Sequence, residues 1–219
     1  MDKVLARLGE LRIVPVVAIE NAGDATPLAD ALIEGGLPCT EVTFRTQAAA
    51  KAIETLARRG DLLVGAGTVI SVDQVKTARD AGARFIVSPG LNPRVVSYCV
   101  QNGLPITPGV CTPSDIERAL DFGLDVLKFF PAEAFGGLKT LKALCGPYTA
   151  VRFIPTGGIH PGNLSEYLNF APVLACGGTW LAKPSLILEG KFDEILINTI
   201  EAVRIAAVCG RPGQPGSRL

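Results

Sequence analysis

Short apolar segments alternate with longer amphipathic segments along most of this chain. In the first half, glycines recur at nearly regular intervals, each between the end of an amphipathic segment and the next apolar run: Gly36, Gly60, Gly82, Gly103 and Gly123. A glycine directly after a helix accepts the left-handed conformation that ends it. The pattern therefore predicts a repeated unit in which a strand is followed by a helix and a glycine.

Eight short runs have the composition of buried strands, because they are apolar through most of their length rather than at alternate positions. They are residues 13–19, 39–43, 62–65, 85–88, 105–107, 126–129, 152–155 and 173–176. Such runs are typical of parallel strands with helices on one side and packed side chains on the other. Eight units in 219 residues predict an α/β protein with a parallel (β/α)8, or TIM, barrel.

Signals at predicted helix starts agree with this fold. Asn92-Pro93 and Thr112-Pro113 each place a capping side chain before a proline at the first helical position. An open doubly wound sheet is the alternative, but the glycines of 65–67 are not followed by the third glycine of a dinucleotide-binding fingerprint. The barrel interpretation is therefore preferred.

We expect one domain, residues 1–209, with residues 1–12 as an extra N-terminal helix. Residues 210–219 contain too little to bury and are expected to form a flexible C-terminal tail. No apolar run reaches the roughly 20 residues that a membrane-spanning helix needs, and the start of the chain lacks a secretion signal. These features predict a cytoplasmic protein with no membrane partner.

Charge and cysteine content narrow the function further. The 21 basic residues balance 21 acidic ones, which disfavours a nucleic-acid surface and favours a small-molecule partner. The six cysteines form no Cys-x-x-Cys pair and are expected to be free thiols. Because His160 is the only histidine, a histidine-rich metal site and a Ser-His-Asp triad are both hard to build, and we expect no metal.

Lys128 is the strongest candidate for chemistry, because it interrupts the apolar run 126–130. Burial favours the uncharged amine, which is a nucleophile. In the alternative interpretation, Lys128 lies at a strand end and its amine reaches solvent. Lys183 is the only plausible rival among the other lysines.

Other candidates lie where predicted strands end, since the reactive groups of such barrels come from there. Glu41 is expected to point into the barrel mouth as a proton-transfer group, or else to form a structural ion pair with Arg45 or Lys128. Arg45 offers a planar fork for a substrate carboxylate, unless it is a solvated loop arginine. Thr68 follows the third predicted strand.

Two glycine pairs predict a phosphate site. Gly157-Gly158 follows the seventh predicted strand and Gly177-Gly178 the eighth, and these two loops commonly bind phosphate in such barrels. Their backbone N–H groups can approach an anion, and the Thr179 hydroxyl adds a donor. A single Gly-Gly pair also occurs in ordinary turns, but two pairs at equivalent places favour phosphate.

Six segments also carry a resemblance to a known family. They are 41–46, 65–69, 88–90, 128–133, 155–159 and 177–180. Together they resemble the 2-keto-3-deoxy-6-phosphogluconate (KDPG) aldolase and 4-hydroxy-2-oxoglutarate aldolase family of class I lyases. The resemblance runs in order from about residue 10 to residue 205, and Lys-Phe-Phe-Pro-Ala-Glu and Pro-Thr-Gly-Gly-Ile are its most specific parts.

The resemblance implies a homotrimeric barrel that cleaves 2-dehydro-3-deoxy-6-phosphogluconate to pyruvate and glyceraldehyde 3-phosphate, a step of the Entner-Doudoroff pathway. It also implies cleavage of 4-hydroxy-2-oxoglutarate to pyruvate and glyoxylate, with neither a metal nor a cofactor. The galactonate-series aldolase is an alternative, as is a phosphate-binding isomerase or synthase that uses no imine. A sugar-phosphate sensor that binds its ligand without consuming it is a third possibility.

The resemblance also implies roles for individual residues. Lys128 corresponds to the Schiff-base lysine, Glu41 to the proton-transfer residue, and Arg45 and Thr68 to groups that bind the pyruvyl portion. Thr179 stands where many members have serine, which keeps the hydroxyl and leaves the aldehyde preference open. The other expected substrate-binding residues are Pro89, Phe130 and Thr156.

Overall fold

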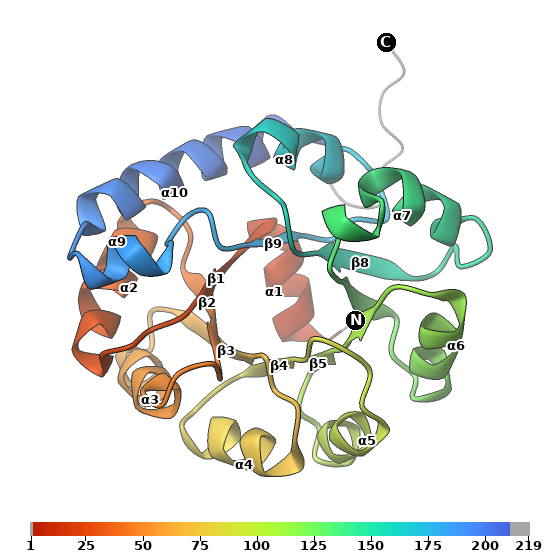
Figure 1. Ribbon diagram of the computed structural model, residues 1–219, viewed down its shortest axis with the longest axis horizontal. Helices are drawn as coiled ribbons and strands as arrows, with labels where there is room; N and C mark the ends of the chain where they lie inside the picture. The colour runs from red at the N-terminus through yellow and green to blue at the C-terminus, as the bar shows by residue number, and fades with distance from the viewer. Residues whose placement is uncertain (1, 211–219) are drawn as a thin grey trace.

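A barrel of parallel strands ringed by helices dominates the computed structural model, which describes residues 2–210 (Figure 1). The strands are β1 (Ile13–Val17), β2 (Cys39–Thr43), β3 (Leu63–Gly67), β4 (Phe85–Val87), β5 (Ile106–Thr107), β6 (Gly109–Val110), β7 (Val126–Phe129), β8 (Arg152–Pro155) and β9 (Cys176–Gly178). All the pairings are parallel. The predicted (β/α)8 barrel is confirmed.

The barrel wall consists of two hydrogen-bonded sheets, ordered β5-β4-β3-β2-β1-β9 and β6-β7-β8. On one side, Pro108 separates β5 from β6, because proline has no N–H to donate to a neighbouring strand. On the other side, isolated parallel bridges join Phe153 to Val173 and Thr156 to Gly177. Since β5 and β6 are two halves of one wall strand, the wall has eight strands, as the sequence predicts.

The eighth predicted strand is the largest boundary error. The sequence predicts 173–176, whereas β9 pairs with β1 through both glycines, with Ile13 opposite Cys176 and Pro15 opposite Gly178. Gly177 and Gly178 are therefore part of the barrel wall and do not follow it as a loop. The predicted strands 39–43, 126–129 and 152–155 match β2, β7 and β8 at both ends. The remaining strand ends differ by at most two residues, apart from the extension through β6.

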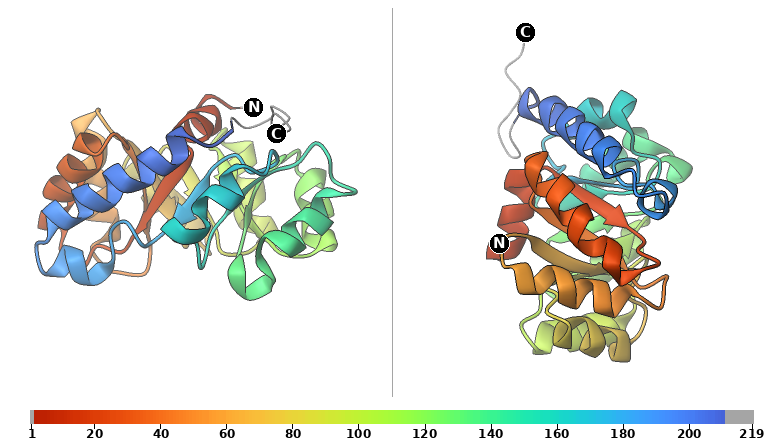
Figure 2. Two further views of the ribbon diagram at one scale, coloured as in Figure 1. Left: turned by 90° about the horizontal axis from the view of Figure 1, so that it is seen from above. Right: turned by 90° about the vertical axis from the view of Figure 1, so that its left-hand side faces the viewer.

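Helices surround the barrel and cover its outer face (Figure 2). They are α1 (Lys3–Leu11), α2 (Ala25–Glu34), α3 (Ala49–Arg59), α4 (Val72–Asp80), α5 (Pro93–Gln101), α6 (Pro113–Asp121), α7 (Gly137–Cys145), α8 (Pro161–Leu168), α9 (Pro184–Leu188) and α10 (Phe192–Ala207), with 3-10 turns η1 (Ala22–Asp24) and η2 (Glu133–Phe135). The 16-residue helix α10 packs against α2 and α8. None of these helices is long and apolar enough to cross a lipid bilayer.

The predicted helix ends agree with the structure. The five glycines that follow helices all have positive φ, between 61° at Gly103 and 96° at Gly82. At the helix starts, Asn92 caps α5 by accepting from the Arg94 N–H, and Thr112 caps α6 by accepting from the Asp115 N–H. These local signals therefore fix where strands and helices alternate.

The extra N-terminal helix closes one end of the barrel. Helix α1 ends directly before β1 begins, and Figure 1 shows it across the centre of the ring of strands. Its Leu5 and Leu8 are buried in the same apolar cluster as Val14 and Phe85. Because strands begin at this end, the reactive groups expected at strand C-termini lie at the opposite, open end.

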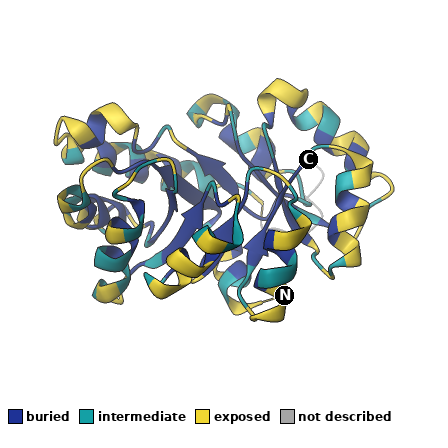
Figure 3. Cartoon of the chain, turned by 60° about the horizontal axis from the view of Figure 1, so that its bottom comes forward, coloured by how far each residue is buried: buried dark blue, intermediate teal, exposed yellow. Residues whose placement is uncertain are grey.

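The last described residue is held in place. The Gly210 N–H donates to Asn169 Oδ1 at 2.9 Å, and its carbonyl accepts from Arg12 Nη1 at 2.6 Å. The expected tail of 210–219 therefore loses its first residue, and 211–219 lie outside the described residues. Burial is concentrated in the strands, whose residues are nearly all buried, while the helices expose their outer faces (Figure 3).

Candidate active site

Lys128 lies in the wall of the barrel and points inward. It is the third residue of β7, paired with Gly109 on one side and Ile154 on the other. Only 6 % of the residue is exposed, so the alternative in which its amine reaches bulk solvent is wrong. The rival Lys183 is exposed and precedes α9. Lys128 is therefore the buried nucleophile candidate.

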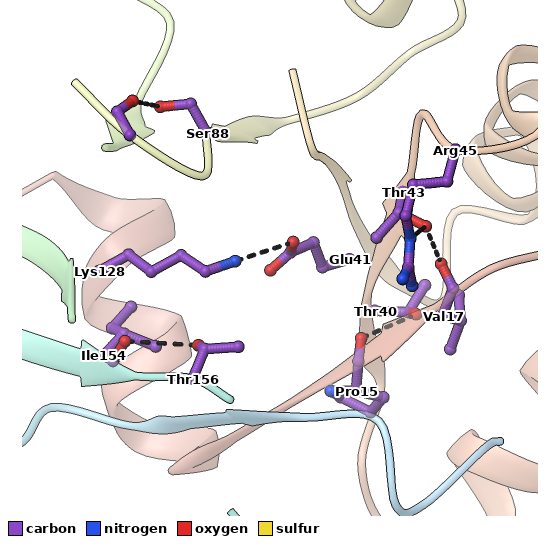
Figure 4. Close-up of polar contacts among 11 residues, drawn as sticks. Pro15, Val17, Thr40, Glu41, Thr43, Arg45, Ser88, Lys128, Ile154 and Thr156 are labelled. Carbon is purple, nitrogen blue, oxygen red and sulfur yellow. Dashed lines mark hydrogen bonds and ion pairs between the residues drawn. The ribbon is translucent and has the colours of Figure 1, made fainter. Parts of the chain in front are cut away.

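Glu41 faces Lys128 across the barrel interior. It extends from β2, and its Oε1 atom lies 3.5 Å from Lys128 Nζ (Figure 4). Glu41 is 3 % exposed, so the pair is shielded from water on most sides. Gly67 on the neighbouring strand makes room for it, since a Cβ atom there would lie 2.0 Å from Glu41 Oε1. This role of Gly67 is not evident from the local sequence.

A cavity of about 220 Å³ opens beside this pair at the C-terminal ends of the strands. Every predicted site residue except Gly177 lines it, including Pro89, Phe130 and Thr156. The Lys128 amine also lies 5.1 Å from the centre of the Phe130 ring. Larger depressions of about 410–490 Å³ lie on the outside of the barrel among the described residues, but no buried charged residue lines them.

Gly177 supports the cavity wall from behind. It forms a parallel bridge with Thr156, and a Cβ atom at Gly177 would lie 2.3 Å from Thr156 Oγ1. Gly178 lines the cavity but also has a packing requirement, since a Cβ atom there would lie 1.6 Å from the Trp180 ring. Both glycines therefore have a structural reason for lacking a side chain.

Arg45 follows β2, and the residue is exposed, as a solvated loop arginine would be. Its side chain nevertheless lines the cavity, and its Nε donates to Thr43 Oγ1 at 3.1 Å. The Thr43 hydroxyl in turn donates to the Val17 carbonyl at 2.9 Å (Figure 4). No other hydrogen bond of its guanidinium is found among residues 2–210, so its remaining N–H groups can bind a ligand, in agreement with the carboxylate-binding hypothesis.

Thr43, Val16 and Ile159 also line the cavity and were not predicted as site residues. Thr43 could have been found, because it lies two residues after Glu41 on the same strand. Side chains two apart on a strand point to the same face.

Thr68 is held in a strained conformation. Its φ is 57°, in the left-handed region that a β-branched side chain rarely adopts. Within residues 2–210, Arg12 is the only other non-glycine residue with positive φ. Strain of this kind persists where the surrounding structure fixes the backbone, often at functional sites. Thr68 lines the cavity directly after Gly67, which makes room for Glu41.

The predicted glycine loop after β8 also has an unusual backbone. Gly157 and Gly158 have φ of 98° and 83°, so a residue with a side chain would be strained at either position. Both line the cavity together with the exposed Thr179 after β9. The loop therefore brings bare backbone to the cavity, as the phosphate-site hypothesis requires.

The cysteines are free thiols, as the sequence predicts. Burial raises the pKa of Cys39 to about 12 and that of Cys99 to about 12, and it raises the pKa of Cys145 to about 11. None of these three thiols is a ready nucleophile near neutral pH. Among residues 2–210, no group of three or more His, Cys, Asp or Glu side chains is placed to hold a metal ion.

A buried lysine beside a carboxylate, at the open mouth of a (β/α)8 barrel, defines an enzyme site suited to imine formation with a carbonyl compound. A family model described as KDPG and KHG aldolase matches residues 4–197. The chain belongs to this family.

Individual relatives agree with the family model. The chain is 50 % identical over 209 residues to a 2-dehydro-3-deoxy-phosphogluconate aldolase of Treponema pallidum, covering 95 % of this chain and 100 % of the relative. It is 42 % identical over 192 residues to the KHG/KDPG aldolase of Escherichia coli K12, covering 87 % and 90 %. The crystal structure of a Legionella pneumophila KDPG aldolase, with pyruvate captured as a covalent carbinolamine, has a TM-score of 0.88 at 38 % identity and covers 92 % of this chain and 98 % of that one.

Proposed function

We propose that this protein is a class I aldolase that uses Lys128 to cleave 2-dehydro-3-deoxy-6-phosphogluconate to pyruvate and glyceraldehyde 3-phosphate. The same site would cleave 4-hydroxy-2-oxoglutarate to pyruvate and glyoxylate. The observation that carries the proposal is the buried Lys128–Glu41 pair, 3.5 Å apart, at a cavity of about 220 Å³.

Lys128 supplies the covalent step. Its uncharged amine attacks the C2 ketone of the substrate, and loss of water gives a protonated imine. When the C3–C4 bond breaks, its electron pair moves to the imine, which becomes an enamine. The position of Lys128 supports this role, because its buried side chain lines the cavity that would admit the ketone.

Glu41 moves the proton that cleavage requires. As the C3–C4 bond breaks, the C4 hydroxyl loses its proton, through a water molecule, to the Glu41 carboxylate, and the aldehyde leaves. The proton then returns to C3 of the enamine, and hydrolysis of the imine releases pyruvate and frees the amine. The position of Glu41 beside Lys128 supports a proton-transfer role in both half-reactions.

Two groups of cavity-lining residues would hold the substrate. Arg45, with Thr68, binds the carboxylate of the pyruvyl portion, while Gly157, Gly158 and Thr179 bind the phosphate. The scissile bond is thereby fixed next to Lys128 and Glu41. Orientation of this kind can lower a barrier by several kcal/mol.

The decisive experiment is to mix the protein with pyruvate, reduce it with borohydride and locate the added mass by peptide mapping. We expect the adduct on Lys128 in the wild type and no adduct in Lys128→Ala. The matched control is Lys183→Ala, which removes an exposed lysine and should leave the adduct unchanged. An adduct on Lys183 would refute the assignment of Lys128 and relocate the site. No adduct in the wild type would refute the imine mechanism and favour an isomerase or a sensor.

We further infer a homotrimer in the cytoplasm, with residues 1–209 as one domain. The trimer is suggested by the family resemblance, and the free thiols are in keeping with a reducing compartment. Light scattering after size-exclusion chromatography tests the assembly. A mass of three chains is expected, and a stable single chain would contradict it.

A further inference from the structure

Helix α8 packs directly behind the glycine loop of the cavity. The loop follows β8, and α8 begins at Pro161, only a few residues after Gly158. Asn163 and Tyr167 are four residues apart on α8, so they lie on the same face of the helix. The Asn163 side chain makes a hydrogen bond to the loop, and the Tyr167 hydroxyl makes one to Glu133, which packs against the loop. Neither residue has a role in the proposed mechanism.

Asn163 holds the loop by its backbone. Its Nδ2 donates to the Gly158 carbonyl at 3.1 Å, while its Oδ1 accepts from the His160 N–H at 2.9 Å. One side chain thereby links the start of α8 to the second glycine of the loop. The conformation of Gly158, with φ of 83°, is fixed from the helix side.

Tyr167 acts one helical turn further on. It is 1 % exposed, and its hydroxyl donates to the Glu133 carboxylate of η2. Burial, together with this carboxylate, raises the pKa of Tyr167, so the phenol keeps its proton and remains a donor across the neutral range. The bond connects α8 to the segment that directly follows the catalytic strand β7.

Glu133 packs against the loop from the other side. A Cβ atom at Gly158 would lie 2.5 Å from Glu133 Cβ, so the glutamate stem rests on the bare glycine backbone. The Glu133 N–H donates to the Gly157 carbonyl at 3.0 Å, and the Ala132 N–H donates to the Thr156 carbonyl at 2.8 Å. The loop is therefore held between η2 and α8.

We propose that Glu133, Asn163 and Tyr167 are positioning residues that hold the Gly157–Gly158 loop in its phosphate-binding shape, and that they thereby set the preference for phosphorylated over unphosphorylated keto acids. The inference rests on the proposed function. None of the three lines the cavity, so they act through the loop rather than by contact with the substrate. The side-chain hydrogen bonds of Lys128 and Arg45 go to Glu41 and Thr43 and to none of these three residues.

The test measures phosphate binding and imine formation separately. Tyr167→Phe keeps the ring but deletes the hydroxyl, and it should raise KM for the phosphorylated substrate about tenfold, as loss of one hydrogen bond to a charged group predicts. Inhibition by inorganic phosphate should weaken by a similar factor. The rate at which pyruvate is trapped on Lys128 should stay at the wild-type value.

If Tyr167→Phe impairs folding, variants of Glu133 test the same hydrogen bond from its acceptor side. Glu133→Ala removes the acceptor and should reproduce the Tyr167→Phe effect, whereas Glu133→Gln retains an oxygen for the phenol and should restore the phosphate affinity. The Tyr167→Phe/Glu133→Ala double variant should be no worse than either single one, because both remove one interaction. Thermal melting confirms that each variant is folded.

The matched control is Tyr148→Phe. The Tyr148 hydroxyl donates to Glu117 at 2.9 Å, so the change deletes the same kind of hydrogen bond away from the cavity. It should alter neither measurement. Equal losses in phosphate affinity and pyruvate trapping, or no loss of phosphate affinity in Tyr167→Phe and Glu133→Ala, would overturn the inference. If the proposed function itself is wrong, pyruvate will not be trapped on Lys128 in the wild-type protein.

Discussion

Two basic side chains, those of Arg12 and Lys128, are buried to the same degree in this barrel but have different surroundings. Arg12 and Lys128 are each 6 % exposed. Arg12 lies between α1 and β1, where its guanidinium donates to the carbonyls of Gly210 and Leu168. No acidic side chain within residues 2–210 forms an ion pair with Arg12, and burial lowers its pKa.

Lys128 has a carboxylate and an open cavity beside it instead. Carbonyl groups accept hydrogen bonds from a buried arginine without exchanging protons, so Arg12 links segments that are distant in the sequence. A carboxylate can accept and return a proton, and a cavity admits a substrate. Burial alone therefore does not give a basic side chain a role in catalysis. That role also depends on the neighbouring groups and on whether a ligand can reach the side chain.

The largest expected effect is on activity, at Lys128. Lys128→Ala should reduce turnover by more than about 10³-fold, because the covalent intermediate cannot form. The barrel should stay folded, since the adjacent cavity gives water access to Glu41. Steady-state kinetics and circular dichroism test both statements. Activity near the wild-type level would contradict the role of Lys128.

The second largest effect is expected for Glu41→Gln. Turnover should slow by about 10²–10³-fold, because the amide cannot accept the proton released in cleavage. KM should change little, and the deficit should appear in kcat. A variant that loses only substrate affinity would show Glu41 to be a binding group.

Arg12→Met should produce a loss of stability instead of a loss of chemistry. The change leaves two carbonyls without their buried donor, and we expect the free energy of unfolding to fall by about 2–3 kcal/mol. Urea unfolding measures this loss. Pyruvate trapping on Lys128, measured well below the unfolding transition, should be normal. If pyruvate were not trapped in folded Arg12→Met protein, Arg12 would contribute to the chemistry as well as to stability.

The smallest effect is expected at Thr43. Thr43→Val removes the acceptor for Arg45 Nε and should raise KM for keto acids about tenfold, whether or not they carry phosphate. Thr43→Ser keeps the hydroxyl and should preserve affinity. An unchanged KM in Thr43→Val would show that Arg45 is oriented by other contacts or is not needed.

The sequence predicted features that depend on local chemistry. Apolar runs located the strands, capping residues and glycines located the helix ends, and Lys128 stood out as a charge in an apolar run. The error at β9 arose because Gly177-Gly178 is typical of a turn, whereas pairing with β1 holds both glycines in the wall. Tertiary pairing overrode local preference there.

Features that depend on distant contacts could not be predicted in this way. Nothing in the segment around Gly67 indicates that the glycine makes room for Glu41. Glu133 and Tyr167 are 34 residues apart, and only the folded chain brings them together. The hydrogen bond from Arg45 to Thr43 depends on a side-chain conformation that the spacing of residues does not fix.

The closure of the barrel by α1 has a consequence for the order of product release. Beneath Lys128 and Glu41, between them and Leu8 of α1, the free space is only about 10 Å³, too small for either product. Substrate and products must therefore enter and leave through the open end of the barrel, at the C-terminal ends of the strands. In the proposed mechanism pyruvate stays covalently attached to Lys128 after cleavage. The aldehyde should therefore leave first, and added aldehyde should trap the enzyme-bound pyruvyl group in the reverse reaction.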